Sequence, residues 1–112
     1  MTLARDERGE AHEELAAQAH FYEREHAGLG IDFLDAVDAS IEAIAEFPDA
    51  WRPYPGWDRE PLVRVKQVQG FPVGIVYFVD GGTLVIVAYA HHQRDAAYWA
   101  SRTSASPDGS GR

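Results

Sequence analysis

Five basic side chains in the second half of the chain are of the types that RNA cleavage requires: Arg64, Lys66, His91, His92 and Arg94. RNA is cut when its 2′-hydroxyl attacks the neighbouring phosphate. This reaction needs a base for the proton, a cation beside the phosphate and a donor for the leaving oxygen. Imidazole titrates close to neutral pH and can move the proton. We therefore take Arg64, Arg94 and one of the two histidines as candidate catalytic residues, and Lys66 as a candidate substrate-binding residue.

The same positions also have structural interpretations. His91 and His92 are adjacent and project to opposite sides of a strand, so one of them is expected to be buried or hydrogen-bonded. Tyr98 and Trp99 are candidates for stacking on an unpaired base. Covering the open end of the core is the favoured use of these two aromatic rings. Arg102 is expected to be a surface charge.

Strands must hold these side chains. Residues 73–80 and 83–90 are almost continuously apolar, which predicts strands that are covered on both faces. The Asp80-Gly81-Gly82-Thr83 junction predicts a tight hairpin between them. An earlier alternation of valine with Arg64 and Lys66 places both cations on one face of another strand. The basic residues are thus expected to lie on a rigid sheet.

Two amphipathic helices precede the strands. The first is expected from about Glu10 to His26, with an apolar stripe of Ala11, Leu15, Ala19 and Tyr22. After Gly28-Leu29-Gly30, a second helix capped by Asp32 and ended by Pro48 presents an apolar seam of Leu34, Val37, Ile41 and Ile44. Its other face carries the carboxylates of Asp35, Asp38, Glu42 and Glu46, which are expected to be solvated. The two helices form a hairpin with one apolar side.

The order of elements predicts an α+β fold, in which an N-terminal helical hairpin packs on a sheet of three to four antiparallel strands. Residues 51–61 are rich in proline and aromatic residues and predict a loop. The fourth strand would be residues 2–8, although its charged side chains are poor strand formers. A single domain is expected over residues 1–102, followed by a disordered tail over residues 103–112.

Composition narrows the functional classes. The net charge of the 112 residues is −8, and residues 1–50 carry three arginines against thirteen carboxylates. An RNA site would therefore have to be a local basic patch in the second half. The chain has no cysteine, no apolar run of membrane-spanning length and no signal-peptide pattern, which predicts a cytoplasmic protein without membrane contact.

The histidines of the first helix do not form a metal site. His12 and His20 lie ~12 Å apart along the helix, which is too far for them to share a metal ion. We expect no metal or cofactor.

A set of short motifs runs through the chain in a fixed order: Glu10-Ala11-x-x-Glu14-Leu15, Phe21-Tyr22-Glu23, Leu29-Gly30-x-x-Phe33-Leu34, Pro48, Phe71-Pro72, Ile75-x-Tyr77, and Ala90-His91-x-x-Arg94-Asp95-x-x-Tyr98-Trp99-x-x-Arg102. In order and spacing, they resemble the RelE/ParE superfamily of toxins from type II toxin–antitoxin systems, often called plasmid stabilisation proteins. The resemblance covers about residues 11 to 102.

The resemblance implies a growth-inhibiting toxin that is neutralised by a cognate antitoxin protein. RelE-like members cut mRNA on the ribosome as endoribonucleases, whereas ParE-like members bind DNA gyrase without nuclease chemistry. Two departures bear on this choice: Gln93 stands where the family often has a second arginine, and RelE-like nucleases are usually basic. Arg64 and Lys66 could also anchor antitoxin carboxylates. Ribosome-bound mRNA and gyrase both stay open as targets, as does a decayed member without toxicity.

Overall fold

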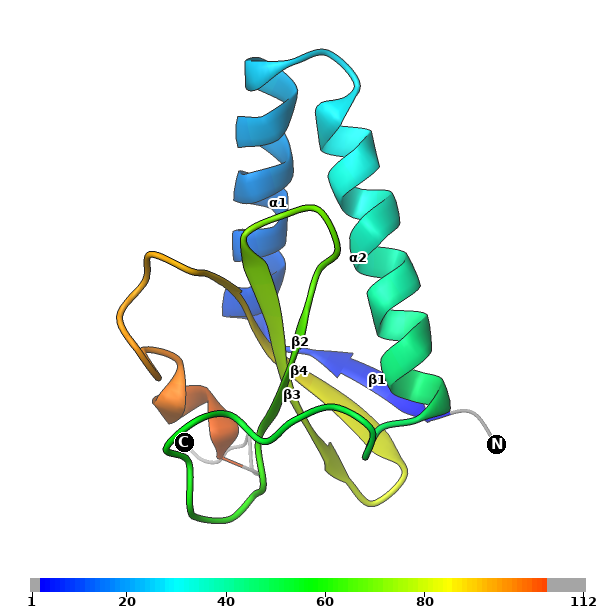
Figure 1. Ribbon diagram of the computed structural model, residues 1–112. Helices are drawn as coiled ribbons and strands as arrows, with labels where there is room; N and C mark the ends of the chain where they lie inside the picture. Colours follow the sequence, from blue (N-terminus) through cyan, green and yellow to red (C-terminus); the bar gives the residue numbers. More distant parts are fainter. Residues whose placement is uncertain (1–2, 105–112) are drawn as a thin grey trace.

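The computed structural model describes residues 3–104 as a helical hairpin packed on one face of a four-stranded sheet (Figure 1). In chain order the elements are β1 (Ala4–Glu7), α1 (Gly9–Glu25), α2 (Leu29–Glu46), β2 (Arg64–Gln67), β3 (Val73–Asp80), β4 (Thr83–His91) and the short 3₁₀ helix η1 (Ala100–Thr103). The strand order in the sheet is β1-β4-β3-β2. The predicted α+β class and the helical hairpin are confirmed.

The sheet is mixed rather than wholly antiparallel. β2, β3 and β4 pair antiparallel as expected, but β1 pairs parallel to β4. Its ends are fixed by backbone bonds from Ala4 N–H to the Gly82 carbonyl and from Arg8 N–H to the Ile86 carbonyl. An edge strand can expose its charged side chains on both sides, so the poor strand propensity of this segment does not prevent pairing.

The helices bury the expected stripes with one exception. In α1, Ala11 is fully buried and the other three stripe residues pack against the core. In α2, Val37, Ile41 and Ile44 are buried, but Leu34 is 36% exposed and the buried residue of that turn is Phe33. Leu34 was therefore wrongly placed in the seam, since it lies about 100° round the helix from Phe33. The four predicted carboxylates of α2 are all exposed.

The start of α2 is capped by a residue of α1 rather than by Asp32. The helix begins at Leu29, directly after Gly28, which has a φ of +91°, a backbone conformation that favours glycine. The Glu23 carboxylate accepts the backbone N–H groups of Gly28 (3.0 Å) and Gly30 (3.0 Å), which satisfies donors that the helix itself leaves unpaired. Asp32 instead lies in the first turn of the helix. These two hydrogen bonds lower the pKa of Glu23 below its ordinary value.

Two apolar layers cover the sheet, as the predicted burial of β3 and β4 requires. The helix side holds Phe33, Ile75 and Leu84, while the other side holds Val76 and the fully buried Trp99. The loop before β2 and the segment after β4 cover only part of this second face. A bulge shifts the register, because Val76 pairs with Ala88 and Tyr77 with Ile86, leaving Val87 as an extra residue in β4.

The connections follow the expected signals. Asp80 pairs with Thr83 across the hairpin turn, where Gly81 has a φ of +61°. α2 ends two residues before Pro48. The Pro48 carbonyl accepts a hydrogen bond from the Tyr77 hydroxyl (2.7 Å), and burial raises the pKa of Tyr77 to about 12.

The predicted tail begins within a described element. Thr103 belongs to η1, and residues 105–112 of the predicted tail lie outside the described residues. Within the described part of the chain, every helix is too short or too polar to cross a bilayer.

The Glu23 cap predicts a pH dependence of stability. The carboxylate stabilises the hairpin fully above its unfolded-state pKa of about 4.5, and this stabilisation is lost as the pH falls through the lower folded-state pKa. Glu23→Gln removes the titration, so its free energy of unfolding should fall less than that of the wild type between about pH 6 and pH 3. Urea titrations across this range test the expectation, with the exposed Glu25→Gln as control. Parallel curves for wild type and Glu23→Gln would contradict it.

Gly30 lies where the two helices approach each other closely. A Cβ added there would lie 2.7 Å from the Ala19 carbonyl oxygen, whereas one added at Gly9, in the first turn of α1, meets nothing within 4 Å. Gly30→Ala should therefore cost about 1–3 kcal/mol despite better helix propensity, and Gly9→Ala should be neutral or stabilising by up to about 1 kcal/mol. Thermal unfolding measures both. Equal shifts in Tm would show that the contact does not limit the packing.

Candidate functional site

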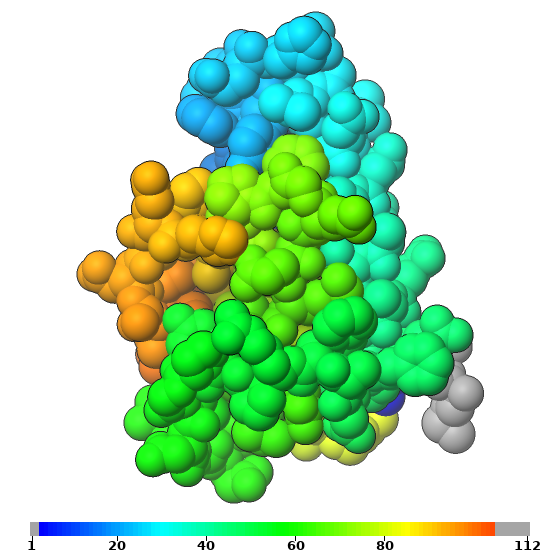
Figure 2. All heavy atoms as spheres, in the orientation of Figure 1, coloured from blue at the N-terminus to red at the C-terminus, as the bar shows by residue number. Residues whose placement is uncertain are grey.

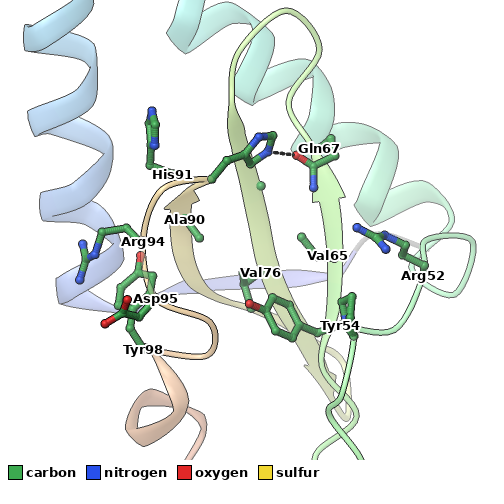
Figure 3. Close-up of a pocket in the computed structure, with 13 residues that line it drawn as sticks. Arg52, Tyr54, Val65, Gln67, Val76, Ala90, His91, Arg94, Asp95 and Tyr98 are labelled. Carbon is green, nitrogen blue, oxygen red and sulfur yellow. Dashed lines mark hydrogen bonds between the residues drawn. The ribbon is translucent and has the colours of Figure 1, made fainter.

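The open half of the second sheet face forms a hollow of about 200 Å³. Figure 2 shows this face, with the strands (yellow-green) between the segment that follows β4 (orange) and the loop that precedes β2 (green). The floor is made of small or branched apolar positions: Val65, Gly74, Val76 and Ala90. The rim is polar and carries Arg52, Tyr54, Gln67, His91, His92, Arg94, Asp95 and Tyr98 (Figure 3). Four of the predicted site residues thus lie on one rim.

The two histidines have different surroundings, as adjacent positions at a strand end require. His92 directly follows β4, and its ring nitrogen Nε2 shares a hydrogen bond with Oε1 of Gln67 in β2. His91 instead accepts the backbone N–H of Gln93 at Nδ1 (3.1 Å) and extends away from the floor, as Figure 3 shows. Gln67 carries no sequence signal of its own. Only the pairing of β2 with β3 brings it to the hollow.

Arg94 lies on the ring of Tyr98. Its guanidinium carbon is 3.8 Å from the ring centroid, a cation–π contact. The Tyr98 hydroxyl donates to Oε2 of Glu14 in α1 (2.8 Å). The pKa of Tyr98 is raised, mainly by burial and secondly by this hydrogen bond. Arg94 lines both the hollow and a second groove of about 550 Å³ that runs between α1 and the turn after β4. This arginine therefore stands on the ridge between two concave surfaces.

Arg102 is not the free surface charge that was expected. Its side chain is 14% exposed, and Nη1 donates to Oε2 of Glu14 (3.0 Å) and to the Val87 carbonyl (3.3 Å). Glu14, which stood in the first family motif without a role assigned to it, also accepts the Tyr89 backbone N–H at Oε1 (3.0 Å). The available signal was its place in α1, next to Leu15 on the inward stripe. A carboxylate at such a position must find donors.

Arg64 and Lys66 leave the same face of β2, as predicted, but it is the face opposite the hollow. Arg64 donates through Nη1 to the Trp51 carbonyl (2.7 Å), and its Nη2 lies 4.0 Å from Asp49. The Lys66 ammonium lies 4.3 Å from the centroid of the Trp51 ring. The alternation along β2 explains the separation: Val65 faces the hollow, so its two neighbours face the helix side.

Trp99 does not offer a face for base stacking. It is fully buried, and its ring contacts those of Tyr54 (centroids 4.8 Å apart) and Trp57 (5.2 Å). Its structure is that of a core residue, the alternative favoured for it above. Within residues 3–104, no group of three or more histidine or acidic side chains is placed to hold a metal ion.

Comparison with known proteins places this architecture in a family. The protein-family model described as the ParE toxin of the type II toxin–antitoxin system parDE matches residues 8–96. The chain belongs to the ParE toxin family. This confirms the resemblance to the RelE/ParE superfamily that the motifs indicated. No curated protein matches the chain.

A solved structure shares the fold of this ParE family member. It is described as the chromosomal ParDE toxin–antitoxin system from P. aeruginosa, and the superposition has a TM-score of 0.67 at 13% sequence identity. It covers 80% of the present chain and 96% of the other. At that identity the likeness shows a common fold and leaves the site to be argued from its own residues.

The position of Arg64 makes a structural role testable. Because its guanidinium joins β2 to the Trp51 carbonyl, Arg64→Ala should lower the free energy of unfolding by about 1–3 kcal/mol. Growth inhibition at a temperature where the variant is folded should not change. Denaturation and a growth assay measure the two effects, with the exposed Arg59→Ala as control. Loss of growth inhibition in a fully stable Arg64→Ala protein would instead make Arg64 a functional residue.

Proposed function

We propose that this ParE family member is the toxin of a type II toxin–antitoxin pair and inhibits growth by binding DNA gyrase, without cutting RNA. The observation that carries the choice of mechanism is the separation of the basic residues. Arg64 and Lys66 lie on the helix side of the sheet, while the histidines and Arg94 lie around the hollow on the other side. Membership of the ParE toxin family supports the same choice.

RNA cleavage would need its groups gathered around one phosphate, in a single site. A base, a phosphate-binding cation and an acid must all come within hydrogen-bond reach of the reacting atoms. Here Arg64 is held by the Trp51 carbonyl and the Tyr98 hydroxyl is committed to Glu14, with a raised pKa that makes it a poor proton donor near neutrality. The net charge of −8 also disfavours a nucleic-acid substrate.

A ribosome-dependent endoribonuclease is the second candidate, because one observation favours it. His91, His92 and Arg94 still gather on the rim of a single hollow, and these side-chain types could move a proton and hold a phosphate. Gln67 orients His92 there through its hydrogen bond. The experiment below separates this candidate from the first.

The antitoxin is expected to occupy the groove between α1 and the turn after β4. Part of its lining is apolar, with Ala17, Phe21 and Tyr22 of α1, and the Phe21 side chain is 48% exposed. His91 and Arg94 lie on its other wall. A helix or strand with apolar anchors and a carboxylate would fit both features, in one of the usual modes of peptide recognition.

Induction of the chain without its antitoxin tests the target. We expect arrested growth with altered plasmid supercoiling and no new mRNA ends. With purified proteins, half-inhibition of gyrase should require about tenfold more of the Arg94→Ala variant than of the wild type, because losing an interface arginine typically has an effect of this size. The Arg24→Ala variant, changed at an exposed position, should match the wild type.

Other outcomes identify the alternatives. New mRNA ends that disappear in Arg94→Ala would replace gyrase binding by the nuclease mechanism. Unimpeded growth with a folded, well-expressed chain would show a decayed member of the family and would reject the proposed toxicity.

A further inference from the structure

The Glu14 carboxylate lies at a junction of three parts of the molecule. It projects from α1 with 14% of its side chain exposed, and its two oxygens accept three hydrogen-bond donors. Oε1 takes the backbone N–H of Tyr89 in β4, and Oε2 takes the hydroxyl of Tyr98 and the Nη1 group of Arg102. Bonds from a fixed backbone and a buried arginine leave such a carboxylate little freedom to move.

The bond to Tyr89 exists because β1 is shorter than its partner. The pairing of β1 with β4 ends at Glu7 and Ile86, so the edge of β4 beyond the bulge has no neighbouring strand. α1 supplies the missing partners there: Glu14 accepts the N–H of Tyr89, and the Gln18 amide donates to its carbonyl (2.9 Å). Glu14 is thus tied to the sheet as well as to its own helix.

The hydrogen bond to Tyr98 fixes this tyrosine, which lies in the segment after β4. Tyr98 presents its ring to the guanidinium of Arg94 at 3.8 Å and, more distantly, to that of Arg102 at 5.1 Å. Arg102 is neutralised by Glu14. Among the described residues, no carboxylate lies within 4.0 Å of Arg94. The Tyr98 ring is therefore a platform that holds an exposed cation whose charge is free to meet a ligand.

We propose that Glu14 is a positioning residue, which orients Arg94 on the ridge between the hollow and the groove by fixing the ring of Tyr98. The proposal rests on the proposed function, because Arg94 is the residue expected to contact the target. An arginine held in one orientation loses less conformational entropy on binding than a free one. Glu14 should therefore strengthen target binding without touching the target.

A double-mutant cycle tests this on the full chain. Glu14→Gln leaves one acceptor oxygen for three donors, and Tyr98→Phe keeps the platform but removes its bond to Glu14. Each should raise the concentration for half-inhibition of gyrase by about two- to fivefold, less than Arg94→Ala, because a mobile Arg94 can still reach the target. In an Arg94→Ala background neither should add a further loss. Glu13→Gln, an exposed neighbour on α1, is the matched control.

A second readout needs no target. The Arg94 Nε–H signal in ¹H–¹⁵N relaxation spectra should show high order in the wild type and Glu13→Gln, and lower order in Glu14→Gln and Tyr98→Phe. Tyr98→Phe keeps this reading available if Glu14→Gln does not fold.

The outcomes distinguish the two proposals. Unchanged Arg94 order in a folded Tyr98→Phe protein would overturn the positioning role, and so would a Glu14→Gln loss that persists in full without Arg94. Lowered Arg94 order together with gyrase inhibition that Arg94→Ala does not affect would support positioning and reject the role of Arg94 in gyrase binding.

Discussion

The rest of the site depends on one partly buried carboxylate that accepts hydrogen bonds from three donors. Glu14 joins α1 to the unpaired edge of β4 and to the segment that follows it, through Tyr89, Tyr98 and Arg102. A partly buried carboxylate without donors would be costly, and donors without it would be equally unsatisfied. The helical hairpin, the sheet and the C-terminal segment are thus held in one arrangement by polar bonds where the apolar layers end.

The alternation of side chains along a strand divides the basic residues between two surfaces. Val65 belongs to the floor of the hollow, so Arg64 and Lys66 must face the helix side, where Trp51 holds both. What is left around the hollow is a set of groups with separate tasks. His92 is bonded to Gln67, and the nearby tyrosine hydroxyls are engaged with protein partners. Such an arrangement is better suited to recognition than to general acid–base catalysis.

Two concave surfaces meet at Arg94, and on the proposed function this geometry would let one residue contact two partners. The hollow has a floor without large side chains, since Gly74 and Ala90 form part of it. The groove beside α1 offers exposed apolar area at Phe21. An antitoxin in the groove would contact the same arginine that the proposed target contacts. Neutralisation would then follow from competition for one cation, without a change of fold.

The sequence by itself determined the helical hairpin, the β3–β4 hairpin and the family, because helical spacing, the glycine turn and the ordered motifs are local signals. It could not determine the parallel direction of β1, the exposure of Leu34 or the burial of Arg102. Nor could it show that Arg64 lies on the face of the sheet opposite the hollow. These features were decided by tertiary structure, since each depends on which distant element covers a face or donates to a buried group, and no spacing along the chain records that.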